Sequence, residues 1–438
     1  MKTGHVALCL LPFVLVALLV AAFAAPPEPL GENAPNDVFS AGRAMAHVRG
    51  LTSTGKPHPA AHYDGSARTP EEIADHDRAR DWVMSSLRNL GLEPVIQKGN
   101  ACGRFTCADV ENVVARWDVG SPGPALVLMA HYDSTPFGPG AADDGAGVAT
   151  LLETVRALKA GPPPKRPLII VIDDGEEMGL LGARVLMKDH PWLNEMELFL
   201  NFEARGTSGQ VAMFETSSGN GALIDTFASS VKRPVASSVI YTLYKRLPND
   251  TDLSIVKQAG KQGLNFAFAD HVYNYHTAKD TETELNLGSL QHMGDQSLAL
   301  SRAFLTAESL PKPTSDSAYF DLFSLVLVHY PENVSGALAL LGAILALVGM
   351  GSALRKKRTS IGRLALAMAV VLGSLVVGAI TGVGLGALLK GAVPKLGNGA
   401  VGNAGDDGRS SCVYPVACHC VHGSCGITRI CSLALSAR

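Results

Sequence analysis

The sequence predicts an α/β fold in which a mostly parallel, twisted sheet carries helices on both faces, together with transmembrane helices. Three observations predict it. Apolar runs of strand length alternate with helical segments from about residue 38 to residue 308, as in α/β domains. Histidines and acids follow several of these runs, at the positions where α/β folds bind ligands. Three stretches that are long enough to cross a bilayer contain no charged residue.

The first predicted helices follow an N-terminal linker. Residues 26–37 are rich in proline and are expected to be that linker, and residues 38–50 are expected to be helical. The start of the next helix is clearly marked. Thr69 can be its N-cap, Pro70 stands at the first helical position, and Glu72 completes a capping box with Thr69. Gly91 is expected to end this helix.

The remaining elements follow from apolar periodicity. Strands are expected at 93–96, 113–117, 125–130, 167–172, 196–202, 210–214 and 263–268. Helices are expected at 145–160, about 179–189 and 286–308. Cys102 and Cys107 stand close enough to pair as a small-loop disulfide, although two unpaired thiols are the alternative.

The uncharged stretches predict the membrane topology. Residues 1–25 are expected to be a signal peptide or an uncleaved signal anchor, and the length of the apolar run favours the anchor. Residues 334–354 and 364–389 are expected to be transmembrane helices joined by the basic loop 355–363. Because basic loops stay on the cytoplasmic side, the middle of the chain is expected to be extracytoplasmic, in the periplasm, a vacuolar or endoplasmic reticulum lumen, or the exterior.

Composition bounds the class of protein. The chain has 438 residues, of which 47% are hydrophobic and 18% charged, so it is more apolar than an average soluble protein. A formal net charge of −3 gives no reason to expect nucleic acid as a partner. Residues 390–438 form a Gly/Cys-rich tail that is expected to be disordered; a small metal knuckle and the truncated or frame-shifted end of a longer membrane region are the alternatives.

The chemistry is expected where acids and histidines follow strands. In "VIDDGEEMG", four carboxylates crowd behind an apolar run, and such a cluster is costly unless positive charge lies among them. Singly, each such group is more often structural, but together they offer the ligands that a zinc site needs. The groups are His131, Asp133, Asp143, Asp144, Asp173, Asp174, Glu176, Glu177, Glu203, His276 and Asp280.

The motifs "HYDS", "PGAADDGAG", "DDGEEMGLLGA", "NFEARG" and "YHTAKDT" resemble the metal-site motifs of the M28 family of co-catalytic zinc aminopeptidases. Upstream, "KPHPA" and "ARDWVMSSLRNLGLEP" are similar to the N-terminal portion of that family. With its flanking apolar helices, the chain most resembles the membrane-anchored branch, which includes vacuolar membrane proteases and endoplasmic reticulum metallopeptidases. The resemblance implies a zinc-aminopeptidase-like fold for an M28-like peptidase domain at residues 38–312.

The resemblance also implies roles for seven residues. Two zinc ions per chain would be held by His131, Asp143, Glu177, Glu203 and His276, with Asp143 bridging them. Glu176 would be the general base that takes a proton from the water between the metals. Asp133 would orient the ring of His131. Many family members have Asp at the position of Glu203, and the longer side chain still offers an oxygen ligand.

The implied function is peptide-bond hydrolysis. The leading hypothesis is a membrane-anchored dizinc aminopeptidase that acts on peptide or protein N-termini, with the lipid bilayer as a second partner. The alternatives are a glutaminyl-cyclase-like transferase that uses one zinc and a non-catalytic, receptor-like module on the same fold. A dipeptidase or carboxypeptidase activity also stays open, because the metal ligands do not define which peptide terminus is bound. The sequence leaves the oligomeric state and the physiological substrate open.

Overall fold

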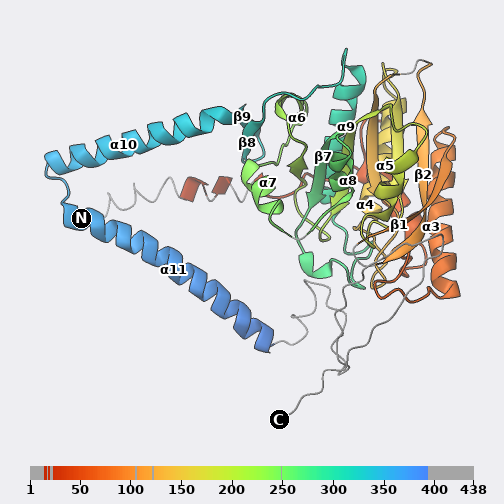
Figure 1. The fold of residues 1–438 in the computed structure, drawn as a ribbon, viewed down its shortest axis with the longest axis horizontal. Helices are drawn as coiled ribbons and strands as arrows, with labels where there is room; N and C mark the ends of the chain where they lie inside the picture. The colour runs from red at the N-terminus through yellow and green to blue at the C-terminus, as the bar shows by residue number, and fades with distance from the viewer. Residues whose placement is uncertain are drawn as a thin grey trace, which may run out of the picture.

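The computed structural model of the chain describes residues 14–16, 18–19, 23–103, 106–120, 123–247 and 249–392. Its centre is a seven-stranded sheet with the order β1-β2-β4-β3-β5-β7-β6 (Figure 1). The strands are β1 (Val95–Cys102), β2 (Cys107–Trp117), β3 (Ala125–His131), β4 (Leu168–Asp173), β5 (Met196–Ala204), β6 (Ala212–Thr216) and β7 (Gln262–Phe268). Only β2 and β6 run against the other strands. The prediction of a mostly parallel sheet is confirmed.

Helices cover both faces of the sheet, as predicted. One face carries α2 (Ala41–Leu51), α3 (Pro70–Asn89), α4 (Gly145–Lys159) and α9 (Leu287–Thr306), and the other carries α5 (Leu181–Asp189) and α8 (Asp252–Gln258). Strand β3 shows why: Leu126 and Leu128 join the apolar core on the first face, and Val127 and Met129 join the core on the second. Successive side chains of a strand point to opposite faces, so a strand buried on both sides is apolar throughout.

The start of α3 confirms the predicted capping box. The Glu72 backbone N–H donates to Thr69 Oγ1 over 3.2 Å, and the Thr69 N–H donates to Glu72 Oε2 over 2.7 Å. Gly91 follows the helix with φ of +70°, a backbone conformation that glycine adopts without strain.

The predicted disulfide is also confirmed. Cys102 ends β1, Cys107 begins β2, and the two residues are joined by a disulfide. They are direct partners in the antiparallel register, so the disulfide closes this β-hairpin at its tip.

Three α-helices and two strands of the described chain were not predicted from the sequence. They are α6 (Gly221–Ser230), α7 (Ser238–Tyr244), α8 and the hairpin formed by β8 (Ser317–Leu322) and β9 (Val326–Pro331). This hairpin follows the predicted peptidase domain along the chain and packs against α6 and α7.

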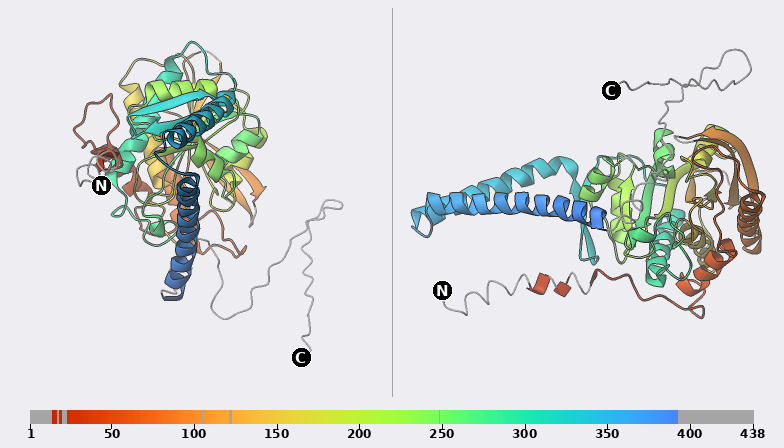
Figure 2. Two further views of the ribbon diagram at one scale, coloured as in Figure 1. Left: turned by 90° about the vertical axis from the view of Figure 1, so that its left-hand side faces the viewer. Right: turned by 90° about the horizontal axis from the view of Figure 1, so that it is seen from below.

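Two apolar helices, α10 (Ser335–Arg355) and α11 (Ile361–Ala392), follow the sheet domain; α10 leads away from it and α11 runs back beside α10 (Figure 2). The segments Glu332–Arg355 and Ile361–Gly382 are long and apolar enough to cross a membrane, by length and composition. Of the predicted signal segment 1–25, most residues lie outside the described part of the chain, and so does the predicted tail from residue 393 onward.

Candidate metal centre

The predicted ligands meet at the carboxyl edge of three neighbouring parallel strands. His131 is the last residue of β3, Glu177 follows β4, and Glu203 lies near the end of β5. Asp143 lies in the glycine-rich loop that leads into α4, and His276 follows the short 3₁₀ helix η1 (Val272–Asn274) after β7. Carboxyl ends of parallel strands are where open α/β sheets bind ligands.

Asp143 lies between two histidine–glutamate pairs. Its Oδ1 is 3.4 Å from His131 Nε2, and the same nitrogen is 3.7 Å from Glu203 Oε2. Its Oδ2 is 3.0 Å from His276 Nε2, which in turn is 3.1 Å from Glu177 Oε2. Each oxygen of one carboxylate therefore faces a different pair.

Two buried atoms of this cluster suit a cation. Among the described residues, His131 Nε2 and Glu177 Oε1 have no hydrogen-bond partner although both are shielded from solvent. Imidazole nitrogen and carboxylate oxygen are the donors that catalytic zinc sites use. The residues present therefore fit zinc.

The structure brings one ligand atom each from His131, Asp143 and Glu177 within 4.8 Å of one another, and does the same for His131, Asp144 and Glu203. Asp144 nevertheless has another role, because its Oδ1 accepts the Gly147 N–H over 2.9 Å and thereby caps α4. Its Oδ2 accepts the His131 N–H over 3.3 Å. Asp144 is thus engaged by two backbone N–H groups, whereas Asp143 lies between His131 and His276.

The pKa values of the clustered side chains also indicate that a positive charge would stabilise the site. Burial, followed by the charge of Asp143, raises the pKa of Glu177 to about 7. Burial also raises the pKa of Glu203 to about 8, and Asp252 adds to this effect. Burial would lower the pKa of His276, but the charge of Glu177 and a hydrogen bond to Asp143 raise it to about 10. Acids that resist ionisation and a histidine that retains its proton indicate excess negative charge at one place.

Asp133 and Glu176, the two residues predicted to be catalytic, contact each other. Asp133 Oδ1 accepts the Glu176 backbone N–H over 3.1 Å and lies 3.3 Å from His131 Nδ1. The Nδ1 of His131 is also 3.0 Å from the carbonyl oxygen of Asp133. A proton on Nδ1 leaves Nε2 as the unprotonated nitrogen that faces Asp143 and Glu203.

The sequence predicted no catalytic role for Asp173 and Asp174, and neither acid belongs to the candidate metal-binding groups of the described residues. Asp174 Oδ1 is 2.8 Å from His76 Nε2, and its Oδ2 accepts the Glu111 N–H over 2.9 Å, so Asp174 fixes the loop after β4. Asp173 is fully buried, and burial, followed by the charge of Asp252, raises its pKa well above the usual value.

Sequence reasoning assigned no function to Asp280 or His58. Asp280 is buried, and its two carboxylate oxygens accept the backbone N–H groups of Ala142 (2.7 Å) and Asp143 (3.1 Å). The His58 ring donates through Nε2 to the carbonyl of Tyr132 over 2.8 Å, next to His131. Their only signals in the sequence were the motifs "YHTAKDT" and "KPHPA".

Aromatic rings border the centre. The rings of Tyr275 and His276 stack with centroids 3.6 Å apart, and the Arg205 guanidinium lies 5.5 Å from the Tyr275 ring. The half-exposed ring of Phe137 stacks on Tyr63 at 6.1 Å. Burial, followed by the charges of Glu177 and Glu176, raises the pKa of Tyr63 beyond its usual range, so this aromatic pair is close to the carboxylates.

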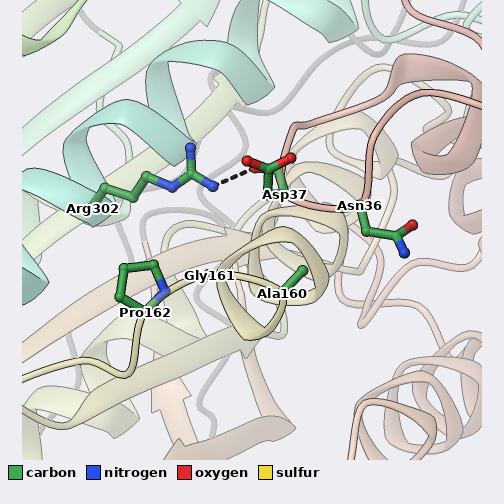
Figure 3. A pocket seen from close by; sticks show the side chains of 6 residues that line it. All are labelled: Asn36, Asp37, Ala160, Gly161, Pro162 and Arg302. Carbon is green, nitrogen blue, oxygen red and sulfur yellow. Dashed lines mark hydrogen bonds between the residues drawn. The ribbon is translucent and has the colours of Figure 1, made fainter.

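A surface depression elsewhere is separate from this chemistry. It is lined by Asn36, Asp37, Ala160, Gly161, Pro162 and Arg302, and Arg302 donates a hydrogen bond to the backbone carbonyl of Asp37 (Figure 3). Ala160 follows the end of α4, whereas Asp143 precedes its start. A 15-residue helix is about 22 Å long, so the depression lies far from the metal centre.

Residues 112–301 match the model of peptidase family M28. The chain contains an M28 peptidase domain. All five predicted metal ligands lie within the matched residues, and the resemblance inferred from the motifs is confirmed.

Among curated proteins, the M28 domain is similar to endoplasmic reticulum metallopeptidase 1 of Mus musculus, with 26% identity over 335 residues, which is 73% of this chain and 37% of the relative. It is also similar to the vacuolar membrane protease of Lachancea thermotolerans, with 32% identity over 63% of this chain and 30% of the relative. The chain thus spans about a third of the length of these relatives.

Among solved structures, the M28 domain is similar to a zinc aminopeptidase from Bacillus subtilis, with 15% identity and a TM-score of 0.48 over 64% of this chain and 98% of that one. It is also similar to a glutaminyl cyclase from Porphyromonas gingivalis, with 21% identity and a TM-score of 0.46 over 60% of this chain and 98% of that one.

Proposed function

We propose that this chain is a membrane-anchored metallopeptidase that binds two zinc ions and acts as an aminopeptidase. The observation that carries the proposal is the position of Asp143, whose Oδ1 faces His131 and whose Oδ2 faces His276. In this assignment one ion would be held by His131, Asp143 and Glu203. The other ion would be held by Glu177 and His276 together with Asp143.

Bound zinc supplies a Lewis acid that polarises a carbonyl oxygen and makes water a better nucleophile near neutral pH. The remaining work falls to side chains. Glu176 takes a proton from the attacking water on its carboxylate and delivers it to the nitrogen that leaves the broken peptide bond. Asp133 holds the backbone of Glu176 and lies against the ring of His131, so it positions the base and one ligand together.

Hydrolysis is favoured over cyclisation by the ligand set. All five ligand positions for two ions are filled by histidine or carboxylate, and Glu176 lies next to them as an acid–base group. A receptor-like module would not need this complete set. The preference for N-termini comes from the resemblance alone, so the experiment below tests it directly.

The membrane arrangement belongs to the same proposal. The M28 peptidase domain comprises residues 38–312, and the apolar helices cross the bilayer on either side of the basic loop 355–363. The relatives named after endoplasmic reticulum and vacuolar membranes support a lumenal or other extracytoplasmic position for the domain.

The test uses the full chain, purified in detergent with zinc, and a mixture of peptides with free or acetylated N-termini. Mass spectrometry identifies the products. Stepwise trimming of only the free peptides is expected, and Glu176→Gln should lose it while retaining zinc. Glu197→Gln is the matched control, because Glu197 is exposed near the opposite end of β5.

Two results would overturn parts of the proposal. Release of C-terminal residues would refute the aminopeptidase assignment but keep the metallopeptidase. No cleavage by a folded, zinc-loaded protein would refute hydrolysis, and ring closure of N-terminal glutamine in the same mixture would then identify a cyclase.

A further inference from the structure

Helix α7 presents an apolar face to solvent. Val239, Ile240 and Leu243 are 66%, 40% and 57% exposed, and Leu247 just beyond the helix is 53% exposed. The opposite side of α7 is the packed one, because Tyr241 is buried there. In water a short surface helix normally exposes its polar side. Helix α7 does the opposite, because its exposed side is apolar.

The β8–β9 hairpin shows the same inversion. Tyr319 of β8 and Leu327 of β9 are buried on its inner side. On its outer side, Leu322 pairs with Val326, and the two residues are 43% and 51% exposed. A two-stranded sheet that faces water on one side normally turns its polar residues outward, whereas this hairpin turns apolar residues outward and has Asp321 and His329 on the side of Tyr319 and Leu327.

Hydrogen bonds hold α7 and the hairpin next to each other. The Tyr319 N–H donates to Ser238 Oγ over 2.9 Å, and the Asp321 N–H donates to the carbonyl of Ala236 over 3.0 Å. We call this surface the α7–hairpin face. It consists of Val239, Ile240, Leu243, Leu247, Phe320, Leu322, Leu325 and Val326.

The α7–hairpin face is the main apolar surface of the domain. Among the described residues from 23 to 334, sixteen large apolar or aromatic side chains are exposed, and these eight are half of them. Apolar side chains gathered in this way mark a surface that binds a partner or a membrane.

The chain meets both of its membrane segments on this side. Strand β9 ends at Pro331, and the membrane-length segment begins at the next residue, Glu332. Gln210 Nε2 donates to the carbonyl of Phe23 (2.8 Å) and to Ser324 Oγ in the hairpin turn (3.1 Å). The end of the N-terminal apolar run therefore lies beside the hairpin turn. In Figures 1 and 2, α10 leaves the domain beside the hairpin, and α11 lies on the same side of the domain.

We propose that the α7–hairpin face lies in the headgroup region of the bilayer that α10 crosses, so that the M28 domain docks on the lipid surface. This inference rests on the proposed membrane anchoring. A surface joined to α10 with no intervening linker is held at the bilayer at high effective concentration. Insertion of apolar side chains to the depth of the headgroups then removes them from water.

Charge agrees with a lipid partner. Lys245 and Arg246 follow the apolar residues of α7 and are both exposed. Basic groups beside an apolar face can reach lipid phosphates while their neighbours insert. The docked orientation also turns the β6 edge of the sheet toward the membrane, because α7 and β6 are in contact. The metal centre, at the carboxyl ends of the central strands, then opens to the side of the domain.

The test measures tryptophan quenching by brominated phospholipids in vesicles that carry the full chain. Leu243→Trp and Leu325→Trp add a probe to the α7–hairpin face. Ile73→Trp is the matched control, because Ile73 is a 42% exposed apolar residue on α3, which packs at the β2 side of the sheet. The two face variants should lose most of their added emission in brominated vesicles, and the control should keep it.

Each other outcome has a defined meaning. No quenching at Leu243 and Leu325, in protein that resists alkaline extraction from the vesicles, would overturn the docking and leave the anchoring intact. Protein that alkali extracts would instead refute the anchoring itself. Unquenched probes with concentration-dependent crosslinking between chains would assign the face to a second copy of this chain and would also overturn the lipid proposal.

Discussion

Asp280 holds the backbone of Asp143, since its Oδ2 accepts the Asp143 N–H over 3.1 Å. Its Oδ1 accepts the neighbouring Ala142 N–H over 2.7 Å. The segment that carries His276 is thereby fastened to the loop that carries Asp143. The geometry of the proposed metal pair thus depends on a residue that touches neither ion.

Asp280→Ala should weaken zinc binding as well as stability. Two buried N–H groups would lose their acceptors, at about 1–3 kcal/mol each, and a misplaced Asp143 should lower zinc affinity about 10–100-fold. Competition with a zinc-binding dye and thermal unfolding measure the two effects. Asp316→Ala is the matched control, because Asp316 also accepts two backbone N–H groups, those of Gly219 and Asn220. Neither of these residues is a proposed zinc ligand. Equal zinc affinity in both variants would contradict the role of Asp280.

Removal of the metal should lower the melting temperature. Zinc that binds only the folded chain stabilises it by about 4 kcal/mol when free zinc is about a thousand times Kd, and chelation removes this term. Glu177→Gln should abolish most of the zinc-dependent shift. Without zinc this variant should melt no lower than the parent, because it removes one of the crowded acids. Differential scanning calorimetry with and without EDTA checks both statements, and a chelator effect of equal size in the variant would count against Glu177 as a ligand.

A glycine at the rim of the site should not tolerate a side chain. A Cβ at Gly138 would lie 2.2 Å from the carbonyl oxygen of Thr277, next to His276. Gly138→Ala should therefore push apart the two loops that carry Asp143 and His276, and we expect a loss of about 1–3 kcal/mol of stability together with weaker zinc binding. Gly31→Ala is the control, because a Cβ there meets nothing within 4 Å. Unchanged zinc affinity in Gly138→Ala would refute the predicted contact.

Acid should destabilise the domain through a histidine outside the metal centre. Burial lowers the pKa of His292 to about 4, and its Nδ1 accepts the Val211 N–H over 3.0 Å. Unfolded histidine titrates near 6.5, so the unfolded chain binds the extra proton first as the pH falls. The contribution of His292 is complete above pH 6.5 and is lost between pH 6.5 and 4, to a total of about 3 kcal/mol. His292→Asn should flatten the fall of unfolding free energy across this window; parallel curves for variant and parent would disprove it.

The sequence predicted the parts of the site whose signals are local. His131 ends an apolar strand, and Asp143 lies in a glycine-rich loop that opens a helix, so both could be placed without knowing the fold. The function of Asp280 was hidden, because it depends on backbone groups more than 130 residues away in sequence. His58 was hidden for the same reason, since its partner is the carbonyl of Tyr132.

The missed fold elements have a different cause. Helix α7 has only seven residues, which is too short for apolar periodicity to show a helix. Its apolar residues also point outward, contrary to the rule used to find buried faces. Strand β2 was predicted to begin at residue 113, but it begins at Cys107, because its polar first half pairs with β1 at the surface.

The two edges of the described sheet carry different risks of unwanted pairing. Beyond β6, the Met213 N–H donates to the carbonyl of Val235, so that edge is occupied. The outer edge of strand β1 could pair with a strand of a neighbouring molecule. Such encounters are frequent for proteins held on a membrane, because their local concentration is high. Lys98, in the middle of β1, is charged and largely exposed, and the disulfide limits fraying at the tip of the hairpin. An added strand would have to desolvate that lysine, which opposes aggregation through this edge.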